Sequence, residues 1–203
     1  PEVESSSLSI TTIFIYKLRL YSIIEKMKTI TEDYKILQQK LHENPNYGVA
    51  STHFAPIVSE IIKAFKINTL SDYGAGKKRL YESLEKLNNL PKDYFPYDPA
   101  FPKYGEPKPA DLVCCIDVLE HIEPDLVDNV IEELSQITTN LGFYTIHMGP
   151  AGKVLEDGRN AHLIQESSSW WLRKLVKYFD IIRLMEHNMM GNGFWLVVKP
   201  KKK

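Results

Sequence analysis

A glycine turn beside a carboxylate is the part of the sequence whose residue types and spacing could do chemistry. Gly74 and Gly76 stand one residue apart, between an apolar strand end and a basic helix start, in the stretch Leu70-Ser-Asp-Tyr-Gly-Ala-Gly-Lys-Lys-Arg-Leu80. Two close glycines allow positive φ angles and let a ligand approach the backbone without a Cβ in the way. The N–H groups of the following helix can hold an anion. Asp72, at the strand end, adds a carboxylate suited to a positively charged ligand.

Asp98 is the second residue that points to a ligand. It follows a predicted strand at 93–97 and lies about 20 residues beyond the glycine turn. A carboxylate at this place can accept hydrogen bonds from both hydroxyls of a ribose. That role fits NAD as well as other adenosine cofactors, but the third glycine position of the dinucleotide fingerprint, counted from Gly74, falls on Arg79. A tight turn that binds no ligand is the alternative interpretation.

Hydrophobic periodicity around these residues predicts an alternation of helices and strands. Helices are expected at 29–41, 56–65, 77–87 and 124–137 and after a cap within 167–169, with Pro56 opening the second helix after a loop at 47–51. Strands are expected at 67–73, 93–97, 111–119, 142–148, 180–187 and 193–199. This order predicts an α/β fold with a doubly wound, mostly parallel Rossmann-like sheet, helices on both faces and a C-terminal antiparallel hairpin. Ligands of such sheets bind at the carboxyl ends of the strands.

Composition limits the class of protein further. The 203 residues suffice for one well-buried domain, and the net charge of −1 shows no basic excess of the kind that binds nucleic acid. Cys114 and Cys115 are adjacent in an apolar run, so we expect them to be buried on opposite sides of the sheet. We predict neither a disulfide nor a metal site. Because no disulfide is expected, we predict a reducing, cytoplasmic location for the protein.

The first residues of the chain are expected to lie outside the fold. The apolar run at 8–16 ends at Lys17, far short of the roughly 20 residues that a membrane-spanning helix needs, so no membrane partner is predicted. Its positive charges follow the apolar run, whereas those of a signal peptide precede it. We therefore expect residues 1–26 to be a non-core leader, not necessarily native, and residues 27–203 to be a single domain.

Two motifs taken together resemble a known family. Asp72-Tyr-Gly-Ala-Gly76 with Asp111-Leu-Val-Cys-Cys-Ile-Asp-Val-Leu-Glu-His-Ile122 is similar to the class I S-adenosylmethionine-dependent methyltransferases, and within them to the small-molecule branch with an Asp-Val-Leu-Glu-His-Ile signature. The resemblance covers about residues 45–200 and implies S-adenosylmethionine as the cofactor. It assigns the methionine part of the cofactor to Asp72, Gly74 and Gly76, the ribose to Asp98, and the adenosine and methyl group to Asp117, Val118 and, as a weaker match, His121.

The chain departs from the family pattern at two places. Lys78 stands where the family turn has its third glycine. The proline-rich stretch 99–109 is too short for a usual strand and helix, so we expect the third strand to be short or missing. The adenine contacts that this strand would carry are left unassigned.

The residues that would face a methyl acceptor stand at the end of the expected strand 142–148 and in the loop that follows it. His147 at the strand tip and His162 in the polar loop 149–166 are the candidate bases. The structural alternatives are that His147 only forms a hydrogen bond at the strand end and that His162 only caps or fixes the loop. Arg159 could bind an acidic substrate group and Trp170 could line the acceptor site. Tyr47 could close over the cofactor or only precede the helix.

The predicted function is S-adenosylmethionine-dependent methyl transfer by in-line displacement to a small-molecule, sugar or lipid acceptor. The sulfonium already makes the methyl group electrophilic, so the protein must mainly align the acceptor. The aromatic-proline tetrapeptides of amino-methylating nucleic-acid enzymes are absent from the sequence. A catalytically silent domain that binds an adenosine cofactor or a partner is the alternative, and a nicotinamide oxidoreductase is a weaker one.

Overall fold

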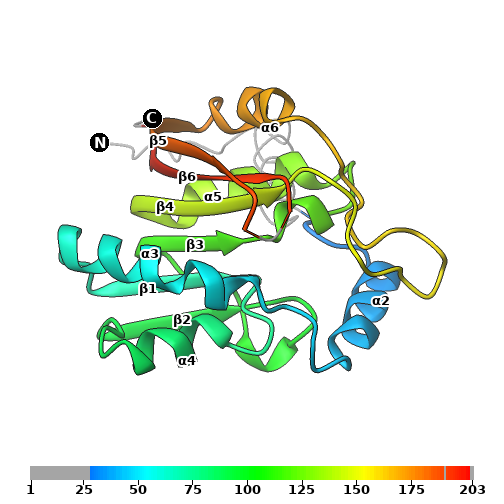
Figure 1. Ribbon diagram of the computed structural model, residues 1–203, viewed down its shortest axis with the longest axis horizontal. Helices are drawn as coiled ribbons and strands as arrows, with labels where there is room; N and C mark the ends of the chain where they lie inside the picture. The colour runs from blue at the N-terminus through cyan, green and yellow to red at the C-terminus, as the bar shows by residue number, and fades with distance from the viewer. Residues whose placement is uncertain (1–27, 190, 202–203) are drawn as a thin grey trace, which may run out of the picture.

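A six-stranded mixed sheet forms the centre of the protein, as a computed structural model shows for residues 28–189 and 191–201 (Figure 1). The strands are β1 (Thr69–Tyr73), β2 (Asp93–Tyr97), β3 (Ala110–Ile116), β4 (Thr138–His147), β5 (Phe179–His187) and β6 (Gly193–Pro200), in the order β2-β1-β3-β4-β6-β5. β2, β1, β3 and β4 pair in parallel, whereas β6 pairs antiparallel with both β4 and β5. The predicted doubly wound sheet with its C-terminal antiparallel hairpin is therefore confirmed.

Helices cover both faces of this sheet and form two separate cores. The helices are α2 (Glu32–His42), α3 (Ala50–Phe65), α4 (Arg79–Lys86), α5 (Val127–Ile137) and α6 (Ser168–Leu175). One core packs α3 and α4 against the sheet and includes Cys114, and the other packs α5 and α6 and includes Cys115. The two cysteines are free and buried, so the prediction that they point to opposite faces is confirmed. Side chains alternate in direction along a strand, which is why neighbours reach different cores.

The connection from β2 to β3 confirms that the third strand of the usual order is missing. Between Tyr97 and Ala110 the chain forms only the short 3₁₀ helix η1 (Pro102–Tyr104). β2 is therefore an edge strand, and it tolerates Pro96 because an edge need not donate every backbone N–H.

Helix α3 begins earlier than predicted. We expected a loop at 47–51 and a helix opened by Pro56, but α3 starts at Ala50 and Pro56 lies inside it. A proline there removes one helical hydrogen bond, to the carbonyl of Thr52. Thr52 is exposed, so water can satisfy that carbonyl. The cap predicted within 167–169 is confirmed, because the Ser167 side chain accepts a hydrogen bond from Trp170 N.

Two further findings concern the ends of the chain and its helices. The predicted leader at 1–26 lies outside the described residues. Among residues 28–189 and 191–201, no helix is both long and apolar enough to cross a membrane.

Candidate active site

A cavity of about 310 Å³ lies at the carboxyl ends of β1, β2, β3 and β4, where the fold predicts a ligand. Its walls include the predicted site residues Tyr47, Asp72, Gly74, Gly76, Asp98, Asp117, Val118, His147 and His162. α2 and the loop after β4 lie at this end of the sheet (Figure 1). The fold therefore brings the predicted residues together from the ends of four strands and from two segments that cover these ends.

The glycine turn is fixed to the end of β2. The N–H groups of Gly74 and Ala75 both donate to the carbonyl of Tyr97, at 2.8 and 2.9 Å. Gly74 has φ +83°, and a Cβ added to it would lie 2.3 Å from Cγ2 of Val118. Gly74 is therefore required partly because the Val118 side chain, from the segment after β3, packs directly on the turn.

Lys78 adopts a left-handed backbone conformation, which glycine occupies more readily than other residues. Its φ and ψ are 59° and 35°, in the left-handed region, and it precedes the first residue of α4. A residue with a Cβ occupies this region at a cost of about 1–2 kcal/mol. A glycine at this position would adopt the same conformation without this cost.

Two buried carboxylates form the acidic wall of the cavity. Asp98 Oδ2 accepts a hydrogen bond from Gly76 N at 2.9 Å, and Oδ1 accepts one from Ala100 N at 2.8 Å. Burial raises the pKa of Asp98 to about 6. Burial raises the pKa of Asp72 to about 7, although the Tyr94 hydroxyl donates a hydrogen bond to it. Both carboxylates are thus costly to ionise without a positively charged or hydroxyl-bearing ligand.

Three histidines gather on the opposite wall. The ring of His162 lies 4.6 Å from that of His121 and 4.8 Å from that of His147, centroid to centroid. His121 Nδ1 lies 2.7 Å from the carbonyl of Ala161, and His162 Nδ1 lies 2.7 Å from the carbonyl of Gly149. A carbonyl only accepts, so in both rings Nδ1 carries the proton and Nε2 carries the lone pair.

His147 is held at the end of β4 by Gly149. Its Nδ1 lies 3.0 Å from the backbone nitrogen of Gly149 and 3.1 Å from the carbonyl oxygen of the same residue. A Cβ added to Gly191 would lie 2.2 Å from this Nε2, which means that the backbone of the β5–β6 turn covers it. The Nε2 of His147 is therefore sterically confined.

Asp117 lies between the two walls in a strained conformation. It has φ +50°, which is uncommon for a residue other than glycine. Its N–H donates to Thr145 Oγ1 at 2.9 Å, and the same hydroxyl donates to Asp117 Oδ1. Burial raises the pKa of this carboxyl. Strain of this kind persists where the surrounding structure holds it, commonly at ligand sites.

α2 and the segment after it close one side of the cavity. Thr31 donates to both oxygens of Glu123, through N at 2.8 Å and Oγ1 at 2.7 Å, which ties the start of α2 to the chain after β3. The Tyr47 ring lies edge-on between His42, at 4.9 Å, and His121, at 6.0 Å. Tyr47 thus joins the acidic wall to the histidine wall, and its closure over a cofactor stays a prediction.

Two predicted acceptor residues lie elsewhere. Arg159 does not line the cavity, because its guanidinium pairs with Asp157 at 2.6 Å and its cation lies over the ring of Tyr34. Trp170 does not line it either, because its ring packs against Trp171 and the α5–α6 core. Both predictions are corrected: Arg159 stabilises the loop that carries it, and Trp170 stabilises α6.

His42 was not predicted to contact a ligand, and for Glu120 the sequence left open whether it contacts a ligand or only orients the helix that follows. His42 lies at the end of α2, with its Nε2 3.9 Å from Asp98 Oδ2 and its Cε1 3.0 Å from the position of a Cβ on Gly76. Glu120 is fully buried, and one of its oxygens accepts from His147 N at 2.9 Å. No spacing in the sequence relates His42 to Asp98, whereas Glu120 stands within the Asp-Val-Leu-Glu-His-Ile motif.

Comparison with known proteins identifies the fold. No family model and no curated protein sequence matches the chain. The chain is similar in structure to a 1,6-didemethyltoxoflavin-N1-methyltransferase from Burkholderia thailandensis, with a TM-score of 0.54 and 12% identity over 98% of this chain and 93% of that one. It is also similar to the N-methyltransferase NodS from Bradyrhizobium japonicum WM9, with a TM-score of 0.52 and 7% identity over 85% and 100% of the two chains.

A third similar structure is the magnesium protoporphyrin IX methyltransferase from Synechocystis PCC 6803, with a TM-score of 0.50 and 14% identity over 75% of this chain and 84% of that one. All three structures hold S-adenosylhomocysteine. The chain therefore has the fold of the class I S-adenosylmethionine-dependent methyltransferases, as the two sequence motifs predicted.

Proposed function

We propose that the chain binds S-adenosylmethionine in this cavity and transfers its methyl group to a small-molecule, sugar or lipid acceptor. The observation that carries the proposal is that one cavity has a glycine turn and two carboxylates on one wall and three histidines on the other. The fold supports it, because three structures of the same fold hold the demethylated cofactor. The motifs at 72–76 and 111–122 support it independently of the fold.

The acidic wall suits the charge of the cofactor. S-adenosylmethionine carries a sulfonium and an α-ammonium, and it offers two ribose hydroxyls. We assign the ribose to Asp98 and the methionine ammonium to the neighbourhood of Asp72 and the glycine turn. A positive ligand would lower the pKa values of both carboxyls and recover the free energy that their burial costs.

The histidine wall suits an acceptor that must lose a proton. In the transfer, the acceptor's lone pair forms the new bond to the methyl carbon, the S–CH₃ bonding pair stays on sulfur, and the acceptor's proton leaves to a base. His162 meets the requirements for this base better than His147, because its Nε2 has a lone pair, whereas the Nε2 of His147 is covered by the backbone of Gly191.

A turnover experiment with matched variants tests the proposal. The full chain is incubated with S-adenosylmethionine and a mixed-metabolite extract, and S-adenosylhomocysteine is measured against time. We expect extract-dependent release that falls at least about a hundredfold in His162→Gln and is unchanged in His53→Gln, a change of the same kind at an exposed position. Full turnover in His162→Gln would exclude this residue as the essential base.

The same measurements separate the alternatives. A catalytically silent domain would bind the cofactor and release no product with any extract. A nicotinamide oxidoreductase would bind NAD, but the turn has Arg79 where the phosphate fingerprint needs a small residue. The Arg79 guanidinium already donates to the carbonyl of Pro45 at 2.5 Å.

A further inference from the structure

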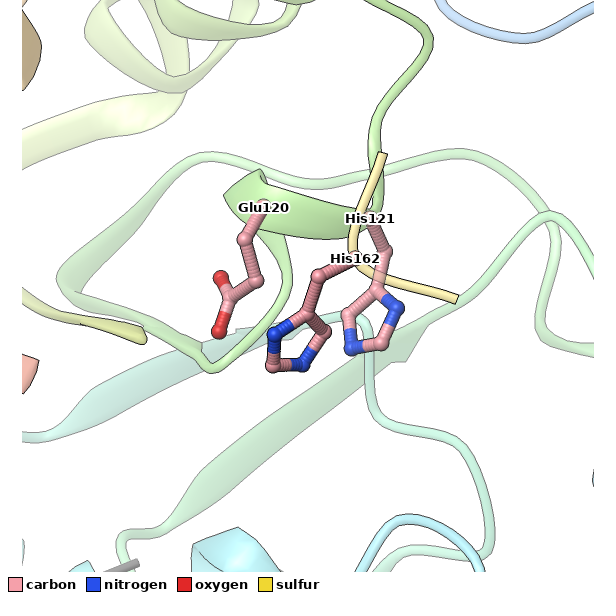
Figure 2. Close-up of side chains that lie close together, drawn as sticks. All are labelled: Glu120, His121 and His162. Carbon is pink, nitrogen blue, oxygen red and sulfur yellow. The ribbon is translucent and has the colours of Figure 1, made fainter. Parts of the chain in front are cut away.

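We propose that Glu120, His121 and His162 bind a divalent metal ion at the acceptor end of the cavity. Figure 2 shows the three side chains converging from η2 (Leu119–His121) and from the loop after β4, with the two imidazole rings side by side and the Glu120 carboxylate next to them. One carboxylate oxygen and one nitrogen from each ring lie within 4.8 Å of one another. The sequence predicted no metal site, so this proposal departs from that prediction.

The separations are close to those of a bound ion. Ligand atoms about 2.1 Å from one metal ion lie at most about 4.2 Å apart. Atoms within 4.8 Å of one another would thus need side-chain shifts on the order of 1 Å to share an ion. His121 and His162 both line the cavity.

The hydrogen bonds of both rings prepare them as ligands. Histidines that bind metal commonly donate their other N–H to a carbonyl, which fixes the tautomer and the orientation of the ring. Here Nδ1 of His121 donates to Ala161 and Nδ1 of His162 donates to Gly149. Because Nδ1 carries the proton in both rings, Nε2 of each ring has the lone pair that a metal ion would bind.

The carboxylate supplies an independent reason for an ion. Glu120 has no exposed surface, and its Oε2 is buried without a hydrogen-bond partner, while Oε1 accepts from His147 N. A buried carboxylate oxygen without a partner is costly. A cation beside Oε2 would supply both a partner and a compensating charge.

The ligand set favours a first-row transition ion. Two imidazoles and one carboxylate suit Mn²⁺, Fe²⁺, Co²⁺ or Zn²⁺ better than Mg²⁺, which prefers oxygen ligands only. Three protein ligands leave coordination positions open toward the cavity. The role of these positions rests on the proposed function. They would bind the hydroxyl oxygen of the acceptor, and the ion would lower the pKa of that hydroxyl so that its proton leaves to water. With the ion bound, the Nε2 lone pair of His162 is a metal ligand, and this role replaces the role of base assigned to it above.

Metal binding can be measured without turnover. After chelator treatment, the full chain is titrated with Mn²⁺, and the free ion is followed by electron paramagnetic resonance. We expect one tight site per chain and nitrogen couplings from imidazole in the spin-echo spectrum of the bound ion. Glu120→Gln and His162→Gln should weaken binding at least about tenfold. Glu120→Gln keeps the acceptor for His147 N, so folding, followed by circular dichroism, should survive.

Two exposed residues provide matched controls, Glu60→Gln and His53→Gln, which should bind Mn²⁺ like the parent chain. Absence of binding, absence of nitrogen coupling, or equal loss in the control variants would overturn the proposal. A parallel titration with S-adenosylhomocysteine keeps the two proposals apart. Cofactor binding without Mn²⁺ binding refutes only the metal site, and Mn²⁺ binding without cofactor binding refutes only the proposed function.

Discussion

The buried carboxyl of Asp72 makes the stability of the protein depend on pH in a direction that can be tested. Asp72 is 3% exposed, and its pKa rises from 3.8 to about 7 because burial destabilises the charged form and Asp98 repels it. Between about pH 4 and pH 7 the folded chain keeps a proton that the unfolded chain has released. The free energy of unfolding therefore loses a contribution as the pH rises through this window.

The size of this contribution follows from the pKa values. A difference of about three units corresponds to about 4 kcal/mol, which is an upper bound for a buried group with a hydrogen-bond partner. Asp72→Asn removes the ionisation and keeps an oxygen that accepts from the Tyr94 hydroxyl. We expect the variant to exceed the parent chain in stability by about 2–4 kcal/mol near pH 8, and the difference to vanish near pH 4.

Urea unfolding at several pH values measures this difference. The histidines titrate in both proteins, so their contribution cancels when the variant is compared with the parent. Asp93→Asn, at the exposed start of β2, is the matched control and should show no such dependence. An Asp72→Asn variant that is no more stable near pH 8, or whose stability difference does not change with pH, would refute the reasoning.

Three further predictions concern the turn and its neighbours. Gly74→Ala should cost about 3 kcal/mol in urea unfolding, because its Cβ meets Val118 at 2.3 Å, and adding Val118→Ala should recover part of the loss; no recovery would mean that the contact is unimportant. Lys78→Gly should stabilise the chain by up to about 1 kcal/mol, because φ is 59°, and a loss of stability would contradict this. Burial lowers the pKa of His42 from 6.5 to about 4, so protons bind the unfolded chain first as the pH falls. His42→Gln should therefore lose less stability than the parent between about pH 7 and pH 5, and an equal loss would count against the burial of a neutral ring.

The fold could be predicted because each element carries its own periodic pattern. The run 111–119 is apolar on both faces, as a central parallel strand is, and the proline content of 99–109 excluded a strand there. The limits of the helices were harder, as α3 shows: Pro56 looks like a first helical residue, and only the tertiary structure shows a helix that continues on both sides of it.

The cofactor side of the site could be predicted for a similar reason. Gly74, Gly76 and Asp98 are read from local spacing, and parallel strands bring their carboxyl ends to one edge. The acceptor side depends on how long segments fold over that edge. No pattern in the sequence says that His42 reaches Asp98, or that Arg159 binds Asp157 in its own loop instead of facing the cavity. The proximity of Glu120 to His162, which is far along the chain, is likewise a property of the folded protein.

The central claim is that the cavity binds S-adenosylmethionine through Asp98 and the glycine turn. Calorimetric titration of the full chain with S-adenosylhomocysteine tests it most directly, with Asp98→Asn compared against Asp93→Asn at the other end of the same strand. We predict one site per chain, at least about tenfold weaker binding in Asp98→Asn, no change in Asp93→Asn and no binding of NAD. Absence of S-adenosylhomocysteine binding, or equal affinity in Asp98→Asn, would contradict the account.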